Sequence, residues 1–195
     1  MTTLQATASV MRAPLFKTQD GDSPFEFLVA SIKDFPEAGY LPTPERRIQL
    51  TSDTERAQRY LLEAHDVLVI TVGSIGHVTV VPEDCEANII PATNMYVVRF
   101  SDDRDRRSKA LYSIFKSPAG QELLENLARG RGIQIVPKKV FARIQIPEFS
   151  EELLQTTEEL WRRENELYRE SLSKLNQSRT VFDSLKVSMP EPVAG

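Results

Sequence analysis

The sequence predicts an α+β fold, in which a mixed α/β domain over residues 1–147 precedes one long coiled-coil helix over residues 148–187 and a flexible tail over 188–195. Three observations predict it. Short β-branched runs occur between residues 25 and 100, helical periodicity follows between 106 and 128, and neither Gly nor Pro occurs from Ser150 to Val187. With 195 residues, the chain is long enough to bury a hydrophobic core.

The first third of the domain is predicted to contain a strand, a long loop and a helix after an irregular start. Residues 1–24 have few periodic apolar positions and are expected to be mobile until about residue 14. Residues 25–32 read FEFLVASI, which is typical of a strand. Four Pro or Gly residues between Lys33 and Pro44 then predict a long loop. Ser52 or Asp53 is expected to cap a helix that ends near residue 63.

The middle of the domain is predicted to be a group of strands followed by two helices. Strands are expected at residues 67–72, 78–81 and 95–100, with a Gly-Ser-Ile-Gly turn between the first two. Apolar residues at 3–4 spacing predict a helix over 106–115, and Pro118 begins a second that stops at Gly130. Short strands are expected at 133–136 and 144–146, separated by the basic Pro137-Lys138-Lys139 step.

The last predicted element is a helix of about 55 Å, longer than a small domain is wide. It begins with Ser150 as cap and two glutamates in the first turn. Its apolar residues repeat every seven positions in two rows, which is typical of coiled-coil packing. The rows predicted to pack a partner helix are Leu154, Trp161, Tyr168, Leu175 and Phe182, and beside them Leu153, Leu160 and Leu167. The alternative is a long amphipathic helix that folds back on its own core.

Composition restricts the class of protein. Cys85 is the only cysteine, which excludes an internal disulfide framework and favours a reducing, cytoplasmic compartment. No continuous apolar segment predicts export or a membrane span. The net charge is −4, yet residues 91–147 carry 11 Lys and Arg against 5 Asp and Glu. This basic segment is the part of the chain suited to a phosphate backbone.

The sequence carries no motif for self-contained catalysis. A phosphate-binding loop, a dinucleotide-binding turn and a zinc-protease helix motif are all missing from it, and Val72 stands where a nucleophile elbow would need glycine. The histidines are two, His65 and His77. We therefore expect no catalytic residues, no metal and no cofactor.

Nine residues are candidates for DNA contact. The cations Arg129, Arg131, Lys138 and Lys139 lie in and beside a glycine-containing loop, where they can reach phosphates. Candidate base readers lie in the loop over 33–47 and in the Gly73–Gly76 turn and its end: Lys33, Arg46, Arg47, Ser74 and His77. A plain solvated loop is the alternative for the basic residues.

Several segments resemble one family in the same order along the chain. Residues 66–78 (DVLVITVGSIGHV) and 90–100 (IPATNMYVVRF) are similar to strands of the target recognition domains of Type I restriction-modification specificity subunits. Residues 111–120, 121–130 and 144–147 follow in the family's order, and the long helix resembles its spacer helix. The resemblance covers about residues 25–186. The sequence departs from the family at His77, where a basic residue is frequent, and at 147–150, where a proline-rich segment is reduced to one proline.

The resemblance implies a non-catalytic half-subunit with a single recognition domain and a single spacer helix. Such a chain would bind double-stranded DNA, form a homodimer that recognises a bipartite site, and recruit adenine methyltransferase subunits and, in some systems, a restriction subunit. The alternative from another class is a protein–protein adaptor with a coiled-coil dimerisation helix. A self-sufficient nuclease is disfavoured by the missing motifs.

Overall fold

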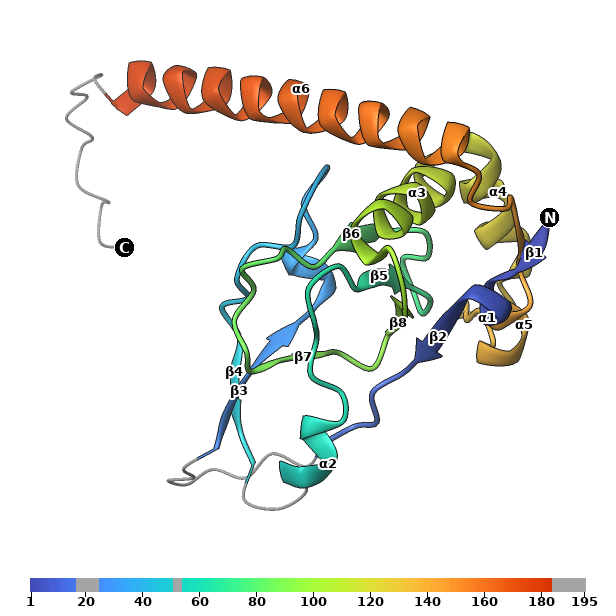
Figure 1. Cartoon of the computed structure of the whole chain (residues 1–195). Coiled ribbons are helices and arrows are strands. Elements are labelled where there is room, and N and C mark those ends of the chain that lie inside the picture. The colour runs from blue at the N-terminus through green and yellow to red at the C-terminus, as the bar shows by residue number, and fades with distance from the viewer. Residues whose placement is uncertain (17–24, 51–53, 184–195) are drawn as a thin grey trace.

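The computed structural model describes residues 1–16, 25–50 and 54–183. Figure 1 shows a mixed domain beneath one long helix, which confirms the predicted α+β class. The strands are β1 (Thr2–Thr3), β2 (Ala8–Met11), β3 (Glu26–Ala30), β4 (Arg47–Gln49), β5 (Val67–Ile70), β6 (Val78–Val80), β7 (Ile89–Pro91), β8 (Met95–Phe100) and β9 (Gln145–Ile146). The helices are α1 (Leu4–Thr7), the 3-10 helix η1 (Ile32–Asp34), α2 (Thr54–Gln58), α3 (Arg104–Lys116), α4 (Pro118–Leu127), α5 (Lys138–Ala142) and α6 (Glu151–Asp183).

The central sheet is antiparallel, with strand order β2-β8-β5-β6. Side chains alternate across a strand, so Val67 and Val69 of β5 enter the core beneath α3 while Leu68 and Ile70 enter a second core on the opposite face. All four side chains are fully buried. Burial on both faces explains why β5 is apolar at every position rather than at every second one.

A second sheet has the order β4-β3-β7, with β3 antiparallel to β4 and parallel to β7. Leu28 and Ala30 of β3 share a core with Leu68 and Ile70 of β5. Phe27 and Val29 point the other way, into a third cluster. The two sheets are therefore joined through a common apolar layer.

Helices α3 and α6 form successive layers above the central sheet. Figure 1 shows α3 between the sheet and the first part of α6. Helix α4 follows α3 after a single residue, Ser117, whose side chain accepts a hydrogen bond of 3.1 Å from the Gly120 N–H. A Cβ at Gly120 would lie 2.0 Å from the Ile114 carbonyl oxygen, so only glycine permits this tight corner.

The N-terminal segment corrects one prediction. Residues 1–16 are packed structure rather than a mobile start, because Leu4 is fully buried in the main core and β2 pairs with β8 over residues 8–11. Strand β1 pairs with β9, which brings Thr2 opposite Ile146. The chain start thus supplies an edge strand to the central sheet.

Other differences concern short elements. Helix α2 ends at Gln58 rather than near residue 63, and the predicted caps Ser52 and Asp53 lie outside the described residues. The Pro137-Lys138-Lys139 step is the start of α5, because Pro137, with φ −65°, suits a helix N-terminus. The expected strand over 133–136 is reduced to isolated bridges at Ile135. No helix within the described residues combines the length and apolar character that a membrane span requires.

Candidate nucleic-acid interface

Three segments that the sequence singled out lie next to one another: the loop over residues 31–46, the turn over 73–76, and residues 129–135, which form a hairpin. A cleft of about 340 Å³ separates the 31–46 loop from the turn. Its lining includes Phe35 and Glu37 from the loop and Gly76 and His77 from the turn. The predicted base-reading segments are thus neighbours, although some 30 residues separate them in sequence.

A larger groove is lined by the same 31–46 loop. It has a volume of about 1000 Å³ and runs between this loop and Tyr168 of α6. Lys33 and Arg46 line it, together with Asp34 and Glu45. Lys33 and Arg46 are exposed and have no ion-pair partner among the described residues. The 31–46 loop therefore lines two concave surfaces.

The 73–76 turn is held in one conformation by its glycines and by α4. Gly73 and Gly76 have φ values of +81° and +95°, a region that favours glycine. The Gln121 side chain donates a hydrogen bond of 2.9 Å to the Gly76 carbonyl, and a Cβ at Gly76 would lie 2.5 Å from the Gln121 Oε1 atom. Ser74 and His77 stay exposed. The turn therefore presents polar side chains on a rigid backbone.

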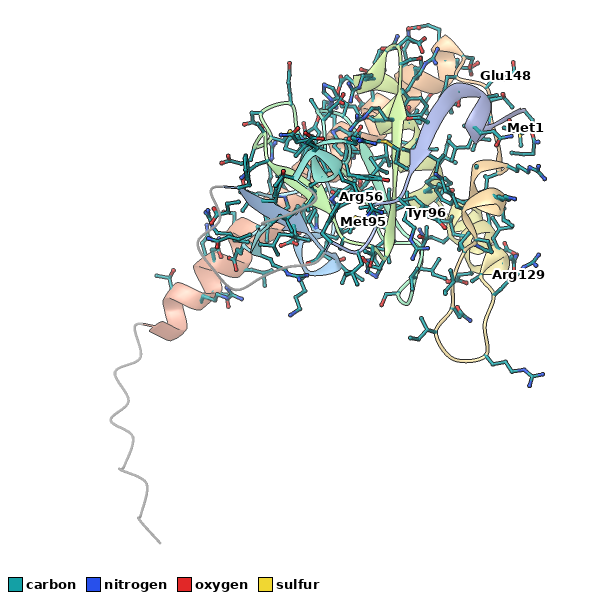
Figure 2. The ribbon with its side chains drawn as sticks, turned by 90° about the horizontal axis from the view of Figure 1, so that it is seen from below. Met1, Arg56, Met95, Tyr96, Arg129 and Glu148 are labelled. Atoms are coloured by element: carbon teal, nitrogen blue, oxygen red, sulfur yellow. The ribbon has the colours of Figure 1, made fainter. Side chains whose placement is uncertain are left out.

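Residues 129–135 form a hairpin that is bonded to this turn. Arg129 and Ile135 exchange two backbone hydrogen bonds of 2.9 Å, and the Gly73 N–H donates to the Gln134 carbonyl at 3.0 Å. Gly130 has φ +131°, which only glycine adopts without strain. Figure 2 shows the loop that follows Arg129 standing away from the rest of the domain. The hairpin is thus a projection with an ordered base.

The basic segment over residues 91–147 divides into two groups. Six of its cations form ion pairs within the domain: Arg99, Arg104, Arg106, Arg107, Lys109 and Lys116. Five have no ion pair with any described residue: Arg129, Arg131, Lys138, Lys139 and Arg143. No Asp or Glu occurs between residues 126 and 147. The positive charge that is free to meet an external anion therefore follows residue 128.

Two of the paired cations contact a buried carboxylate. Arg99 donates to both oxygens of Asp66, at 2.8 and 2.6 Å, and also contacts Glu63. Arg104 reaches the same two acidic residues. Burial raises the pKa of the fully buried Asp66 carboxyl, and the hydrogen bonds from Arg99 oppose that rise. These arginines hold β5 and β8 to the start of α3 and are not available to a ligand.

The remaining predicted DNA contacts differ in their surroundings. Lys138 and Lys139 are exposed in the first turn of α5 rather than on the predicted step between strands. Arg47 forms an ion pair with Glu26 on the neighbouring strand β3. Among the five predicted base readers within the described residues, Arg47 is therefore the one whose charge is already paired.

Trp161 fixes the first part of α6 to the domain. Its ring makes T-shaped contacts with Tyr112 of α3 and Tyr40 of the 31–46 loop, at centroid distances of 4.6 and 4.9 Å. Thr157 and Leu154, one and two turns earlier, are also buried. Rings in edge-to-face geometry gain energy beyond the area that they bury. The first three turns of α6 are thus part of the chain's own core.

Ion pairs surround this apolar contact. Arg106 of α3 donates to both carboxylate oxygens of Glu151, at 2.7 and 3.0 Å, and to Glu158 at 3.1 Å. The hydrogen bonds from Arg106 lower the pKa of the Glu151 carboxyl. Lys116 lies 4.0 Å from Glu164 and donates to the Glu37 carbonyl. These contacts set the register between α3 and α6.

The packing of α6 corrects the prediction that its two apolar rows face a partner. Leu154 and Trp161 are covered by the chain's own α3 and 31–46 loop, because the two tyrosines and Arg106 approach α6 from this side. The alternative of a helix packed on its own domain therefore holds for the N-terminal turns alone. From residue 169 to 180 every side chain is exposed.

The second apolar row and Leu175 of the first row remain uncovered. Leu160, Leu167 and Leu175 are 56%, 53% and 60% exposed, while Leu153 is half-buried. Tyr168 is half-buried at the groove beside the 31–46 loop. Phe182 lies in the last turn of α6, and its side chain is outside the described ones. Leu160, Leu167 and Leu175, called the leucine row below, are therefore the part of the predicted partner surface that the chain's own domain leaves exposed.

Sequence reasoning missed how the 31–46 loop is attached to α6. Gly39 has φ +90°, and a Cβ there would lie 2.2 Å from Oδ1 of Asn165 on α6. The Gly39 N–H donates to the Tyr112 hydroxyl at 3.4 Å, and its carbonyl accepts from Thr79 at 3.0 Å. The signal in the sequence is a glycine in a proline-rich loop, immediately before Tyr40. The centre of the loop is therefore fastened beneath the helix.

The same architecture occurs in solved structures. This chain aligns with the Type I restriction-modification system S subunit from M. genitalium at 16% identity and a TM-score of 0.55, over 90% of this chain and 42% of that one. It aligns with the HsdS subunit from Thermoanaerobacter tengcongensis at 14% identity and a TM-score of 0.56, over 91% and 38% of the two chains. A chain of a type I R-M system gives 18% identity and a TM-score of 0.51, over 91% and 43%.

The chain therefore has the fold of Type I S subunits, as the sequence resemblance predicted. It spans about two fifths of the length of these structures. No protein-family model matches the sequence, and no curated protein matches it. Within the described residues, no group of three or more His, Cys, Asp or Glu side chains could hold a metal ion.

The two faces of α6 predict opposite responses to truncation. We expect Trp161→Ala to lower the free energy of unfolding by about 3–5 kcal/mol, because it removes a buried indole from between two tyrosines. The matched variant Arg163→Ala should change it by less than about 0.5 kcal/mol, since that side chain is exposed and forms no ion pair with any described residue. Urea denaturation followed by circular dichroism measures both. Equal effects of the two substitutions would contradict the observed docking of α6.

Proposed function

We propose that this chain is a half-size specificity subunit of a Type I-like restriction-modification system. In this role it binds double-stranded DNA, selects the site, and recruits an adenine methyltransferase that carries out the chemistry, with or without a restriction subunit. The observation that carries the proposal is the acid-free basic segment after residue 128, whose cations pair with no described residue, on a fold shared with S subunits.

Charge and shape together support DNA as the ligand. The five cations without ion pairs among the described residues occupy the projecting hairpin, α5 and the residue after it. Lys33 and Arg46 add two more on the 31–46 loop, beside the groove. Proteins place lysine and arginine on phosphates for affinity and read bases with side chains that enter the grooves. The arginines of the hairpin supply the first kind of contact, and the loop and the 73–76 turn supply contacts of the second kind.

The alternative of a protein–protein adaptor remains the second candidate. The exposed leucine row of α6 favours it, because this surface suits a protein partner as well as a second copy of the chain. An adaptor, however, gives no reason for five cations in a segment of 19 residues without a carboxylate. Salt-dependent binding to duplex DNA separates the two functions.

We infer that the functional unit is a homodimer whose α6 helices pack antiparallel. Each helix would then present Leu160, Leu167 and Leu175 to its partner and carry a recognition domain at its outer end. A two-fold protein matches a two-fold site, so the recognised sequence would be an interrupted palindrome. Leu154 and Trp161 take no part in this interface, because the chain's own domain covers them.

Neutralising the hairpin tests the DNA-binding function. We expect Arg129→Gln with Arg131→Gln to make the plot of log affinity against log salt less steep by about 0.9 for each phosphate that is no longer neutralised. The matched control is Arg56→Gln with Arg59→Gln on and just after α2, which removes two exposed arginines that form no ion pair with any described residue. Fluorescence anisotropy of a labelled duplex pool at several salt concentrations measures the slopes.

Three outcomes of this measurement have different meanings. A reduced slope in the hairpin variant alone supports the proposed interface. Equal slopes in both variants and the unchanged protein would remove the hairpin from the interface. Absence of salt-dependent DNA binding by the unchanged protein would reject the specificity subunit and favour the adaptor.

Substitution of the leucine row tests whether these residues form the interface of the homodimer. Leu160→Ser, Leu167→Ser and Leu175→Ser together should give a monomer, because burial of such side chains contributes about 1.5–3 kcal/mol each to association before ordering costs. The control Leu15→Ser changes a leucine that is 82% exposed and lies far from α6 in sequence. Sedimentation velocity gives the oligomeric state, and circular dichroism checks folding. A triple variant that stays dimeric would place the interface elsewhere.

A further inference from the structure

The tip of the hairpin carries an apolar side chain in an unusual position. Ile133 is 71% exposed, and its neighbour Ile135 is 39% exposed. A single exposed isoleucine on a protein surface needs no explanation by itself. Ile133, however, follows Arg131 and Gly132 at the end of a projection whose cations have no ion-pair partners among the described residues. Ile133 is therefore an exposed apolar side chain at the tip of a basic, projecting loop.

The backbone fixes where this side chain stands. The Arg129–Ile135 hydrogen-bond pair closes the hairpin, and a Cβ at Gly130 would lie 2.5 Å from the Ile133 carbonyl oxygen. The chain on one side of the tip thus packs directly over Gly130 on the other, and the φ of +131° at Gly130 requires glycine there. The Val136 N–H donates to the Thr71 carbonyl at 2.9 Å, which holds the residues after the hairpin against the domain. The isoleucine is held at the tip by local structure.

The shape and chemistry of the tip match the major groove of DNA. That groove is about 12 Å wide and admits elements as broad as an α-helix or a two-stranded β-ribbon, so it has room for this five-residue loop between the paired Arg129 and Ile135. Arg129, at the base of this loop, and Arg131, two residues before Ile133, would lie near the phosphates that border the groove. Inside the groove, the apolar group that base pairs present is the C5-methyl of thymine. An isoleucine beside these arginines therefore has one natural contact there.

We propose that Ile133 is a specificity-determining residue that contacts the C5-methyl group of one thymine in each half of the recognised site. This inference rests on the proposed DNA-binding function and deepens it, because it names a residue and the base that it reads. The arginines provide affinity for any sequence. Ile133 adds a preference for a T·A pair at one position.

The test removes the methyl group from the DNA and the side chain from the protein separately. A preferred duplex is first selected from a randomised pool with the full-length protein, and each thymine is then replaced in turn by uracil, which keeps base pairing and lacks only the methyl. At one position per half-site, the unchanged protein should lose about fourfold in affinity, as expected for one buried carbon. Ile133→Ala should bind the thymine duplex more weakly and be insensitive to uracil at that same position.

Two controls keep the result specific. Leu15→Ala removes a similarly exposed apolar side chain outside the hairpin and should respond to uracil as the unchanged protein does. Ile133→Val retains a branched side chain and should keep part of the uracil effect. Thermal unfolding should be the same for all three variants, because each changed side chain is mostly in water.

The outcomes separate this inference from the proposed function. Sequence-preferring, salt-dependent binding whose uracil responses are identical in Ile133→Ala and the unchanged protein would overturn the methyl contact and leave the DNA-binding function in place. A preferred site without thymine, or a uniform decrease of affinity on every duplex, would overturn it in the same way. Binding without any sequence preference would reject the specificity function itself.

Discussion

The packing of the Trp161 indole between Tyr40 and Tyr112 is the contact on which the arrangement of this molecule depends. It joins three parts of the chain: the long helix α6, the helix α3 that covers the central sheet, and the 31–46 loop. Without it, α6 would keep only the buried Leu154 and Thr157 and a set of partly exposed ion pairs, which contribute little to stability. With it, the direction of the helix is set by the core of the domain.

This contact also divides α6 into two functional parts. The first three turns are buried against the domain, and the side chains from 169 to 180 are exposed. A helix of 33 residues is about 50 Å long, so the exposed part extends well beyond α3, as Figure 1 shows. The same anchor reaches the candidate DNA surface, because Tyr40 belongs to the 31–46 loop and neighbouring Gly39 packs against Asn165 of α6. Helix α6 and the 31–46 loop are therefore held in place by the same set of contacts.

How far the sequence could predict this structure depended on the length of each element. β5, β8, α3, α4 and α6 were predicted because each carries, over four or more residues, a β-branched run, a clear apolar period or a cap. The segments β1, α1 and β2 were missed, because two to four residues cannot show a period and their burial comes from pairing with β9 and β8, far along the chain. For the same reason, β4 and β7 were not anticipated.

The candidate site shows a similar division. The sequence identified the basic segment, the glycine turn and the loop, but not which cations were already paired, since the partners Glu63, Asp66 and Glu151 come from distant parts of the chain. The heptad pattern placed Trp161 and Leu175 in one row. A periodic pattern records that side chains are covered, and it does not say whether the chain's own domain or a partner covers them.

We propose that α6, fixed at one end by Trp161, sets the separation of two recognition domains in a dimer. Deleting residues 170–176 tests it directly, because removal of seven residues keeps the apolar rows in register and shortens the helix by about 10 Å. Selection of preferred duplexes with the full-length and shortened proteins should give half-sites of the same sequence, with a gap shorter by about three base pairs at about 3.4 Å each. An unchanged gap, from a shortened protein that is still dimeric, would contradict this claim.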